Sequence, residues 1–310
     1  MNKWQKAGLI IGVTGATLAT AHLINKMIFA GSVSKDITGT DDTYTFPWNF
    51  GDISYVKRGA GSPVLLVHDL MPYSSSYEWK DVIDELAQKH TVYAIDLLGC
   101  GHSAKPNITY TTYLYVQLLT DFIKKVIGKR TDVIVTGDSV PMVVMSCYCD
   151  DSLYNRMVFV NPENIGKSVL GPRKNSNIIR NLLNSPIIGT MIYNICVSKK
   201  KINRLFNNVS RETIIDAYYE NAHLGGSNAK YLYNSIACRY TTANIIKAIS
   251  EINNSIFIIG GGQVDRISTT IRDYFDLNPS IEFCVIEGVN KLPQLESPAE
   301  LLEHINTYIA

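Results

Sequence analysis

Charged residues are scarce in this chain of 310 residues, and their charges nearly cancel. Asp, Glu, Lys and Arg make up 18% of the sequence, and the net charge is +1. The one run of a single sign, Lys199-Lys200-Lys201, lies beside an expected helix and is most simply a solvated face. Because nucleic-acid binding requires a basic patch or stripe, we expect no nucleic-acid partner. The apolar fraction of 46% instead predicts a globular protein with a sizeable core.

Cysteine is too dispersed to form the dense disulfide framework of a small secreted domain. Cys147 and Cys149 would point to opposite sides of a helix, which argues against a shared metal ion. Buried thiols are the simpler interpretation, with a weak preference for a reducing compartment. We therefore expect no metal site and no cofactor. The six cysteines are Cys100, Cys147, Cys149, Cys196, Cys238 and Cys284.

The N-terminal segment contains an uncharged stretch, residues 7–25, preceded by Lys3 and Lys6. As a helix it would span roughly 28 Å, just short of the ~30 Å hydrocarbon core of a bilayer. Its glycines, threonines and histidine make it a mediocre span. We favour a membrane-anchor-like segment over residues 1–35, with membrane contact through residues 7–30 and a membrane localisation whose side is unassigned. A cleaved signal peptide and a helix docked on a soluble domain stay open as alternatives.

From about residue 50 the sequence alternates between strand-like and helix-like segments. Apolar runs such as residues 64–67 are typical of strands buried on both faces of a parallel sheet. The alternation stops over residues 166–245, where apolar residues keep helical spacing and no strand is evident. We therefore predict an α/β fold with a mostly parallel central sheet and helices on both faces. Residues 36–165 and 246–310 would form this core, and residues 166–245 a helical lid.

Five motifs follow one another at sensible spacing: His68-Asp69-Leu70, residues 96–103 (Asp-x-x-Gly-x-Gly-x-Ser), residues 137–141 (Gly-Asp-Ser-Val-Pro), Gly262-Gln263-Val264-Asp265, and residues 288–298. The third lies between an expected strand and an expected helix, which is the layout of a nucleophile elbow. In this order the motifs make the chain, from about residue 50 to its end, resemble the α/β-hydrolase superfamily.

The resemblance implies a serine hydrolase that acts on an ester or a similar acyl substrate. Ser139 would be the nucleophile and Asp265 the triad acid, while the N–H groups of Leu70 and Val140 would form the oxyanion hole. The position of the triad histidine falls on Lys291. A nucleophilic aspartate, as in dehalogenase and epoxide-hydrolase relatives, would require Asp138 in place of Ser139, and the residues beside it do not favour this.

The lysine at position 291 puts the chemistry in doubt. A lysine acts as a base only when neutral, and moving its pKa from about 10.4 to about 7 costs roughly 4.6 kcal/mol. A carboxylate from Asp265 beside it would favour the charged form. We therefore expect Lys291 to form a salt bridge with Asp265. His68, His102 and His223 could serve as the base, but a structural role is the simpler expectation for each.

Two further departures concern the oxyanion hole and the elbow. Asp69 replaces a glycine of the oxyanion loop, and its charge would oppose acyl transfer if it points inward. Pro141 replaces a small residue but fits the first turn of a helix. Two functions therefore remain: a membrane-anchored serine-hydrolase relative with an incomplete triad, or an inactive hydrolase-fold protein used for ligand binding or protein interaction. Either would take a small apolar or acyl ligand.

Overall fold

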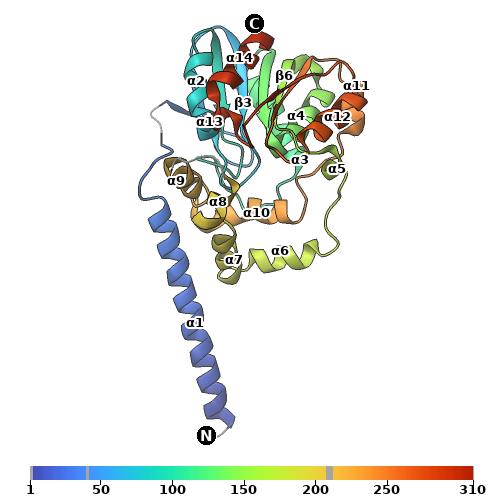
Figure 1. Ribbon diagram of the computed structural model, residues 1–310. Helices are drawn as coiled ribbons and strands as arrows, with labels where there is room; N and C mark the ends of the chain where they lie inside the picture. The colour runs from blue at the N-terminus through green and yellow to red at the C-terminus, as the bar shows by residue number, and fades with distance from the viewer. Residues whose placement is uncertain (1–2, 40–41, 207–211, 310) are drawn as a thin grey trace.

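A twisted eight-stranded sheet forms the centre of the computed structural model, which describes residues 3–39, 42–206 and 212–309 (Figure 1). The strand order is β1-β2-β4-β3-β5-β6-β7-β8. β2 runs antiparallel to β1 and β4, and all other neighbours are parallel. The predicted α/β class is confirmed. The strands are β1 Thr43–Phe46, β2 Ile53–Arg58, β3 Ser62–Val67, β4 His90–Ile95, β5 Thr131–Thr136, β6 Tyr154–Val160, β7 Ile256–Gly261 and β8 Glu282–Ile286.

Helices cover both faces of the sheet, and each face has its own apolar core. On one face α3, α4, α11 and α12 pack on residues such as Val133 and Phe159. On the other, α2 and α14 pack on residues such as Leu66 and Ile134. The all-apolar strands are thus buried from both sides, as a parallel sheet requires. These helices are α2 Lys80–Leu86, α3 Thr112–Phe122, α4 Val140–Cys149, α11 Ile246–Glu251, α12 Ile267–Leu277, α13 Pro293–Glu296 and α14 Pro298–Ile309.

The parallel register brings the carboxyl ends of β3, β5, β6 and β7 to one edge of the sheet. Val67 is paired with Val135, and Val160 with both Thr136 and Ile259. The segments that follow these strands carry the His68, Gly137 and Gly262 motifs. In an open α/β sheet this edge is where ligands bind.

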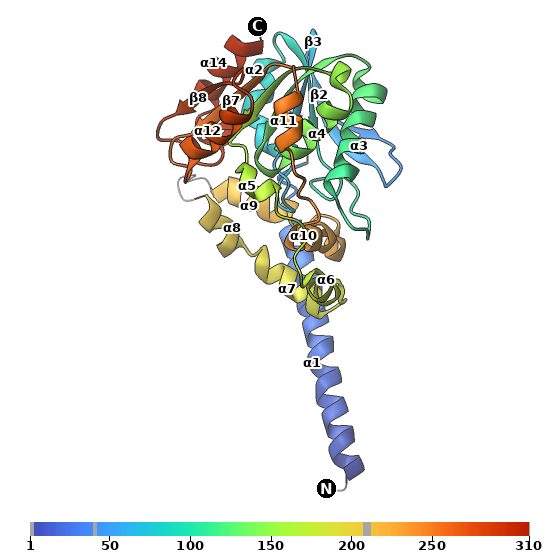
Figure 2. The same ribbon diagram turned by 90° about the vertical axis from the view of Figure 1, so that its right-hand side faces the viewer.

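The described part of the connection from β6 to β7 contains helices but no strand, and it covers this edge (Figures 1 and 2). These helices share a small apolar core that includes Tyr193, Ile202 and Ile214. The same core contains Leu292, just before α13, and Leu295 on α13. The expected lid, residues 166–245, corresponds to this part of the chain. Its helices are α5 Ile165–Ser168, α6 Ser176–Asn184, α7 Ile188–Cys196, α8 Lys199–Leu205, α9 Glu212–Asn221 and α10 Lys230–Ala237.

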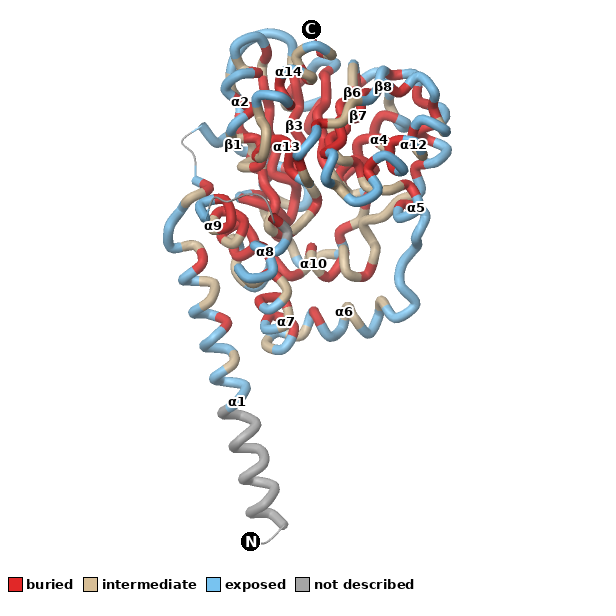
Figure 3. Tube along the Cα trace, viewed as in Figure 1, coloured by how far each residue is buried: buried red, intermediate tan, exposed pale blue. Residues whose placement is uncertain are grey.

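Helix α1, Lys3–Ser32, projects from the lid side of the molecule (Figure 1). Its second half contacts α7, where the Asn25 side chain donates to the carbonyl of Ile187 at 3.2 Å and accepts from Asn194 at 3.0 Å. Along this half much of the helix surface is exposed, in contrast to the buried strands (Figure 3). No helix in the described residues is both long and apolar enough to cross a membrane, so the expected transmembrane anchor is not supported.

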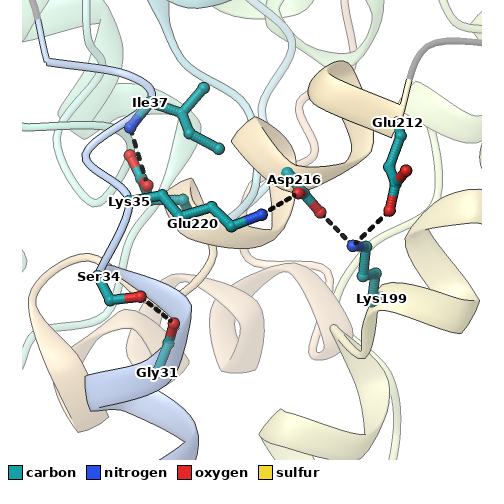
Figure 4. A network of polar contacts seen from close by, with 8 residues as sticks. All are labelled: Gly31, Ser34, Lys35, Ile37, Lys199, Glu212, Asp216 and Glu220. Atoms are coloured by element: carbon teal, nitrogen blue, oxygen red, sulfur yellow. Dashed lines mark hydrogen bonds and ion pairs between the residues drawn. The ribbon is translucent and has the colours of Figure 1, made fainter.

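The segment that follows α1, residues 35–38, forms hydrogen bonds and an ion pair with lid helix α9. The buried Glu220 carboxylate accepts from the backbone N–H groups of Ile37 and Thr38, both at 3.0 Å, and from the Thr38 hydroxyl at 2.8 Å. Lys35 forms an ion pair with Asp216 at 2.9 Å, and Asp216 also pairs with Lys199 of α8 (Figure 4). These contacts join the N-terminal segment to the lid.

Candidate functional site

A cavity of about 690 Å³ lies where the carboxyl edge of the sheet meets the lid. The β3 and β5 loops contribute Asp69, Gly137 and Asp138 to its wall. The loops after β7 and β8 contribute Asp265 and Lys291. Ser139 and Val140 do not line it. The apolar part of the wall consists of Met71, Tyr73, Leu170, Phe206, Tyr218, Val264, Ile267 and Leu292.

The sharp turn between β5 and α4 is centred on Gly137, two residues before the predicted nucleophile. Gly137 has φ +59°, a left-handed conformation that glycine adopts without strain. Ser139 has ordinary helical angles and is fully buried. Its hydroxyl donates to the His68 carbonyl at 2.6 Å. Ser139, the predicted nucleophile, therefore does not face the cavity, because the residue at the apex of the elbow is Gly137.

The oxyanion hole is present but holds a side chain of the protein itself. An elbow offers the N–H of the residue after its apex, and a second N–H comes from the β3 loop. Here these donors belong to Asp138 and Leu70. Both donate to the same atom, Oδ1 of Asp69, at 2.7 and 2.9 Å. The N–H of Leu70, one of the two predicted donors, is thus used by Asp69. The predicted donor Val140 is wrong, because its N–H donates to the Gly137 carbonyl.

Asp69 also occupies the space of the missing nucleophile. A Cβ atom built on Gly137 would overlap with Oδ1 and Cγ of Asp69. The carboxylate therefore lies where a nucleophile side chain would begin, and the oxyanion donors hold it there. Glycine at position 137 and aspartate at position 69 are therefore complementary in shape.

The two remaining triad positions lie at the cavity wall without interacting. Asp265 and Lys291 are both exposed, and neither forms an ion pair within the part of the chain that the structure describes. The predicted salt bridge is therefore absent. The backbone of the Lys291 loop is nonetheless well held: Asn161 donates to the Lys291 carbonyl at 3.1 Å, and Glu296 accepts from the N–H of Leu292 at 3.0 Å.

None of the three histidines considered as substitute bases lines the cavity. His68 is fully buried between the Asp69 carbonyl and the N–H of Leu97, at 2.7 and 3.0 Å, and burial lowers its pKa. The His102 ring lies 3.2 Å from the Thr38 hydroxyl. His223 packs against Phe29 of α1, with ring centroids 5.3 Å apart. All three act as structural groups.

A profile described as "Alpha/beta hydrolase family" matches residues 64–304. The chain belongs to this family. It is 42% identical over 71 residues to the 2-hydroxy-6-oxo-6-(2'-aminophenyl)hexa-2,4-dienoic acid hydrolase of Metapseudomonas resinovorans, which is 23% of this chain and 24% of that protein. It is 48% identical over 52 residues to a soluble epoxide hydrolase of Corynebacterium sp. (strain C12), 17% of this chain and 18% of that protein. The chain thus matches about a quarter or less of either relative.

Solved structures extend the likeness over the whole fold. A serine hydrolase involved in carbazole degradation superimposes with a TM-score of 0.71, covering 86% of this chain and 98% of that chain at 17% identity. A membrane phospholipase A has a TM-score of 0.68, covering 99% of this chain and 98% of that chain at 15% identity. At these identities the likeness shows a common fold.

Within this family fold, the cavity floor carries a carboxyl cluster, defined as Asp69, Glu78, Asp138 and Glu163. The N–H of Asp69 donates to Oε2 of Glu78 at 3.2 Å, and the side chains of Asp138 and Glu163 adjoin. Burial raises the pKa of Glu78 to about 7. Burial, and then the neighbouring carboxylate, raises the pKa of Asp69 and of Asp138. One cation, Lys167, pairs with Glu163 at 2.6 Å.

Two buried polar atoms in the cavity wall form no hydrogen bond of good geometry among the described residues. They are Oε1 of Glu78 and the hydroxyl of Tyr218, each on a side chain 1% exposed. Ser74, Tyr218 and Gln294 surround the Glu78 carboxyl group, and their side chains interact with it. Sequence reasoning missed Glu78 and Tyr218 because neither belongs to a motif.

Proposed function

We propose that this protein is a hydrolase-fold binding protein that takes a small ligand into its cavity and does not hydrolyse esters through Ser139. The observation that carries the proposal is the Asp69 carboxylate in the oxyanion hole, opposite a glycine at the apex of the elbow. Acyl transfer needs a nucleophile, a base and an empty oxyanion hole. The cavity wall offers hydroxyl groups and a lysine, but not in the places where the elbow chemistry uses them.

Energetics favour binding over turnover. Loss of one oxyanion donor costs about 10² to 10³ in kcat, and here both donors are taken by a carboxylate. Loss of a triad histidine alone can cost about a millionfold. The family relatives are hydrolases by name, and the alternative function is a weak membrane-anchored serine hydrolase acting on an ester or similar acyl substrate. That alternative requires both Ser139 and Asp69 to leave the hydrogen bonds described above.

The chemistry of the cavity indicates a ligand with an apolar body and one positively charged group. Aromatic and aliphatic residues form part of the wall, and the carboxyl cluster lies on the floor. No group of three or more His, Cys, Asp or Glu side chains among the described residues is arranged to hold a metal ion, which favours an organic cation such as an amine. An ammonium group would donate to Oε1 of Glu78 and lower the cost of ionising the cluster.

Matched probes test the ligand class. Phenethylamine and phenethyl alcohol have similar shapes and differ in charge, so thermal-shift and calorimetric titrations at pH 8 should show binding of the amine alone. Glu78→Gln should weaken that binding at least about tenfold, as expected for one buried charge pair. Glu85→Gln, an exposed carboxyl group on α2, is the control. Equal binding of amine and alcohol would contradict the ligand class.

Reconstruction tests the loss of catalysis. The triple variant Asp69→Gly, Gly137→Ser, Lys291→His restores a nucleophile at the apex, an empty oxyanion hole and a base. It should hydrolyse 4-nitrophenyl acetate faster than the wild-type protein, whose rate should match that of Ser139→Ala. Wild-type hydrolysis that Ser139→Ala abolishes, with folding retained, would support the hydrolase alternative.

A further inference from the structure

Positive and negative charges are segregated in this chain, although the net charge is near zero. Residues 1–35 and 164–211 contain 13 of the 29 Lys and Arg residues and none of the 28 Asp and Glu residues. All acidic groups therefore lie in the rest of the chain. The Lys199-Lys200-Lys201 run is part of this larger basic region and is not an isolated solvated face.

The fold brings the two acid-free segments together. Helix α1 contacts α7 through Asn25, and the apolar core of the lid joins α7 to α8. Both ribbon views show α7 beside α1, and α6 packs against α7, at the end of the globular part from which α1 projects (Figures 1 and 2). We call the surface formed by α1 and α6–α8 the acid-free surface.

The acid-free surface is also the most apolar exterior of the molecule. Of the 18 exposed large hydrophobic residues in the described part, nine belong to it. They fall in rows at helical spacing: Ile178 and Leu182 on α6, and Ile188, Met191 and Ile195 on α7. On α1, Met27 is 73% exposed and Leu23 60%. Exposed apolar rows of this extent mark an interaction surface.

Cations border these rows. Lys26 of α1, Arg173 and Lys174 before α6, and Lys200 and Lys201 of α8 are all exposed. None of them forms an ion pair in the described structure. The acidic partners within reach of the region, Glu163, Glu212 and Asp216, are used by Lys167, Lys199 and Lys35.

We propose that the acid-free surface docks on an anionic lipid bilayer. Aliphatic rows flanked by Lys and Arg, without acidic residues, are the signature of a helix surface that lies in the interface of a membrane. Each Lys or Arg near an anionic surface adds to binding. A membrane that covers α6 and α7 would also receive the uncharged stretch 7–25, because α1 projects on the same side. A nucleic acid would use the cations but leave the aliphatic rows in water.

Vesicle sedimentation with the full-length protein tests the proposal. The protein should bind vesicles of phosphatidylcholine with 30% phosphatidylglycerol and bind pure phosphatidylcholine vesicles more weakly. The variant Lys174→Gln, Lys200→Gln, Lys201→Gln should lose about tenfold or more in binding to anionic vesicles. The variant Lys57→Gln, Lys89→Gln, Lys129→Gln removes three exposed lysines from the core and should bind like wild type.

A second pair of variants measures how much the exposed apolar side chains contribute to vesicle binding. Ile178→Ser, Leu182→Ser, Ile195→Ser should weaken vesicle binding with no change in net charge, while Phe283→Ser, on strand β8, should not. Circular dichroism checks that each variant is folded. If the lysine variant of the acid-free surface and the lysine variant of the core lose vesicle binding equally, the proposal is overturned. The proposal would also be overturned if the protein bound a DNA duplex more tightly than anionic vesicles and the serine variant bound that duplex as well as wild type does.

Discussion

The cavity floor and the acid-free surface use charge in opposite ways. On the floor, carboxyl groups lie against each other, and burial raises the pKa values of Asp69, Glu78 and Asp138. On the surface, lysines and arginines point into solvent beside exposed aliphatic side chains. The comparison teaches that burial decides what a charge does: a buried charge controls stability and ligand choice, and an exposed one controls only what the surface attracts.

The sharpest contrast between a buried and an exposed carboxylate lies on one helix, α9. Glu220 accepts three hydrogen bonds from the Ile37–Thr38 segment, whereas Glu212 is exposed and pairs with Lys199 at 3.7 Å. Glu220→Ala leaves buried donors without a partner and should lower the free energy of unfolding by about 3 kcal/mol. Glu212→Ala should cost about 0.5 kcal/mol or less. Urea denaturation measures both, and equal losses would break the comparison.

The pH dependence of stability tests the buried acid Glu78. Its folded pKa, about 7, lies above the value of 4.5 for an unperturbed group. The folded state therefore binds more protons than the unfolded state between these values, and stability is lost as pH rises through about 7. This loss amounts to about 3 kcal/mol. Glu78→Gln should remove this part of the decline between pH 5 and pH 8, and an unchanged slope would show that Glu78 ionises freely.

The complementarity of Gly137 and Asp69 predicts a coupled pair. Gly137→Ala should destabilise by about 2 kcal/mol, because the new methyl group meets the Asp69 carboxylate and a left-handed backbone is strained without glycine. With Asp69→Gly the steric part should disappear, giving a coupling energy of about 1 kcal/mol in a double-mutant cycle. Additive effects would mean that the carboxylate does not occupy this space.

The smallest effect is expected on the acid-free surface. Lys200→Gln and Lys201→Gln together should change the free energy of unfolding by less than about 0.5 kcal/mol, while vesicle binding falls. Thermal melts of the two variants and of wild type give the comparison. A large loss of stability would show that these lysines help to stabilise the fold and do not act only in vesicle binding.

The sequence predicted the sheet, its helices and the family because these depend on apolar periodicity and on motif order. It placed the nucleophile two residues too late because residues 137–141, Gly-Asp-Ser-Val-Pro, resemble an elbow motif with serine at its centre. The position of the turn depends on which residue takes a positive φ, and only the backbone shows that this is Gly137. The sequence showed that Asp69 replaces a glycine of the oxyanion loop, but it did not show whether the side chain points inward. The acid-free surface was missed because its two segments lie more than a hundred residues apart.

Covalent labelling with a fluorophosphonate probe tests the central claim most directly, since such a probe reports a nucleophilic serine in a working oxyanion hole. Intact-mass analysis of the full-length protein should show no adduct on wild type or on Ser139→Ala. The variant Asp69→Gly, Gly137→Ser, Lys291→His should carry one adduct, on residue 137. Labelling of wild type that Ser139→Ala abolishes would show that Ser139 reaches the cavity and would contradict this account.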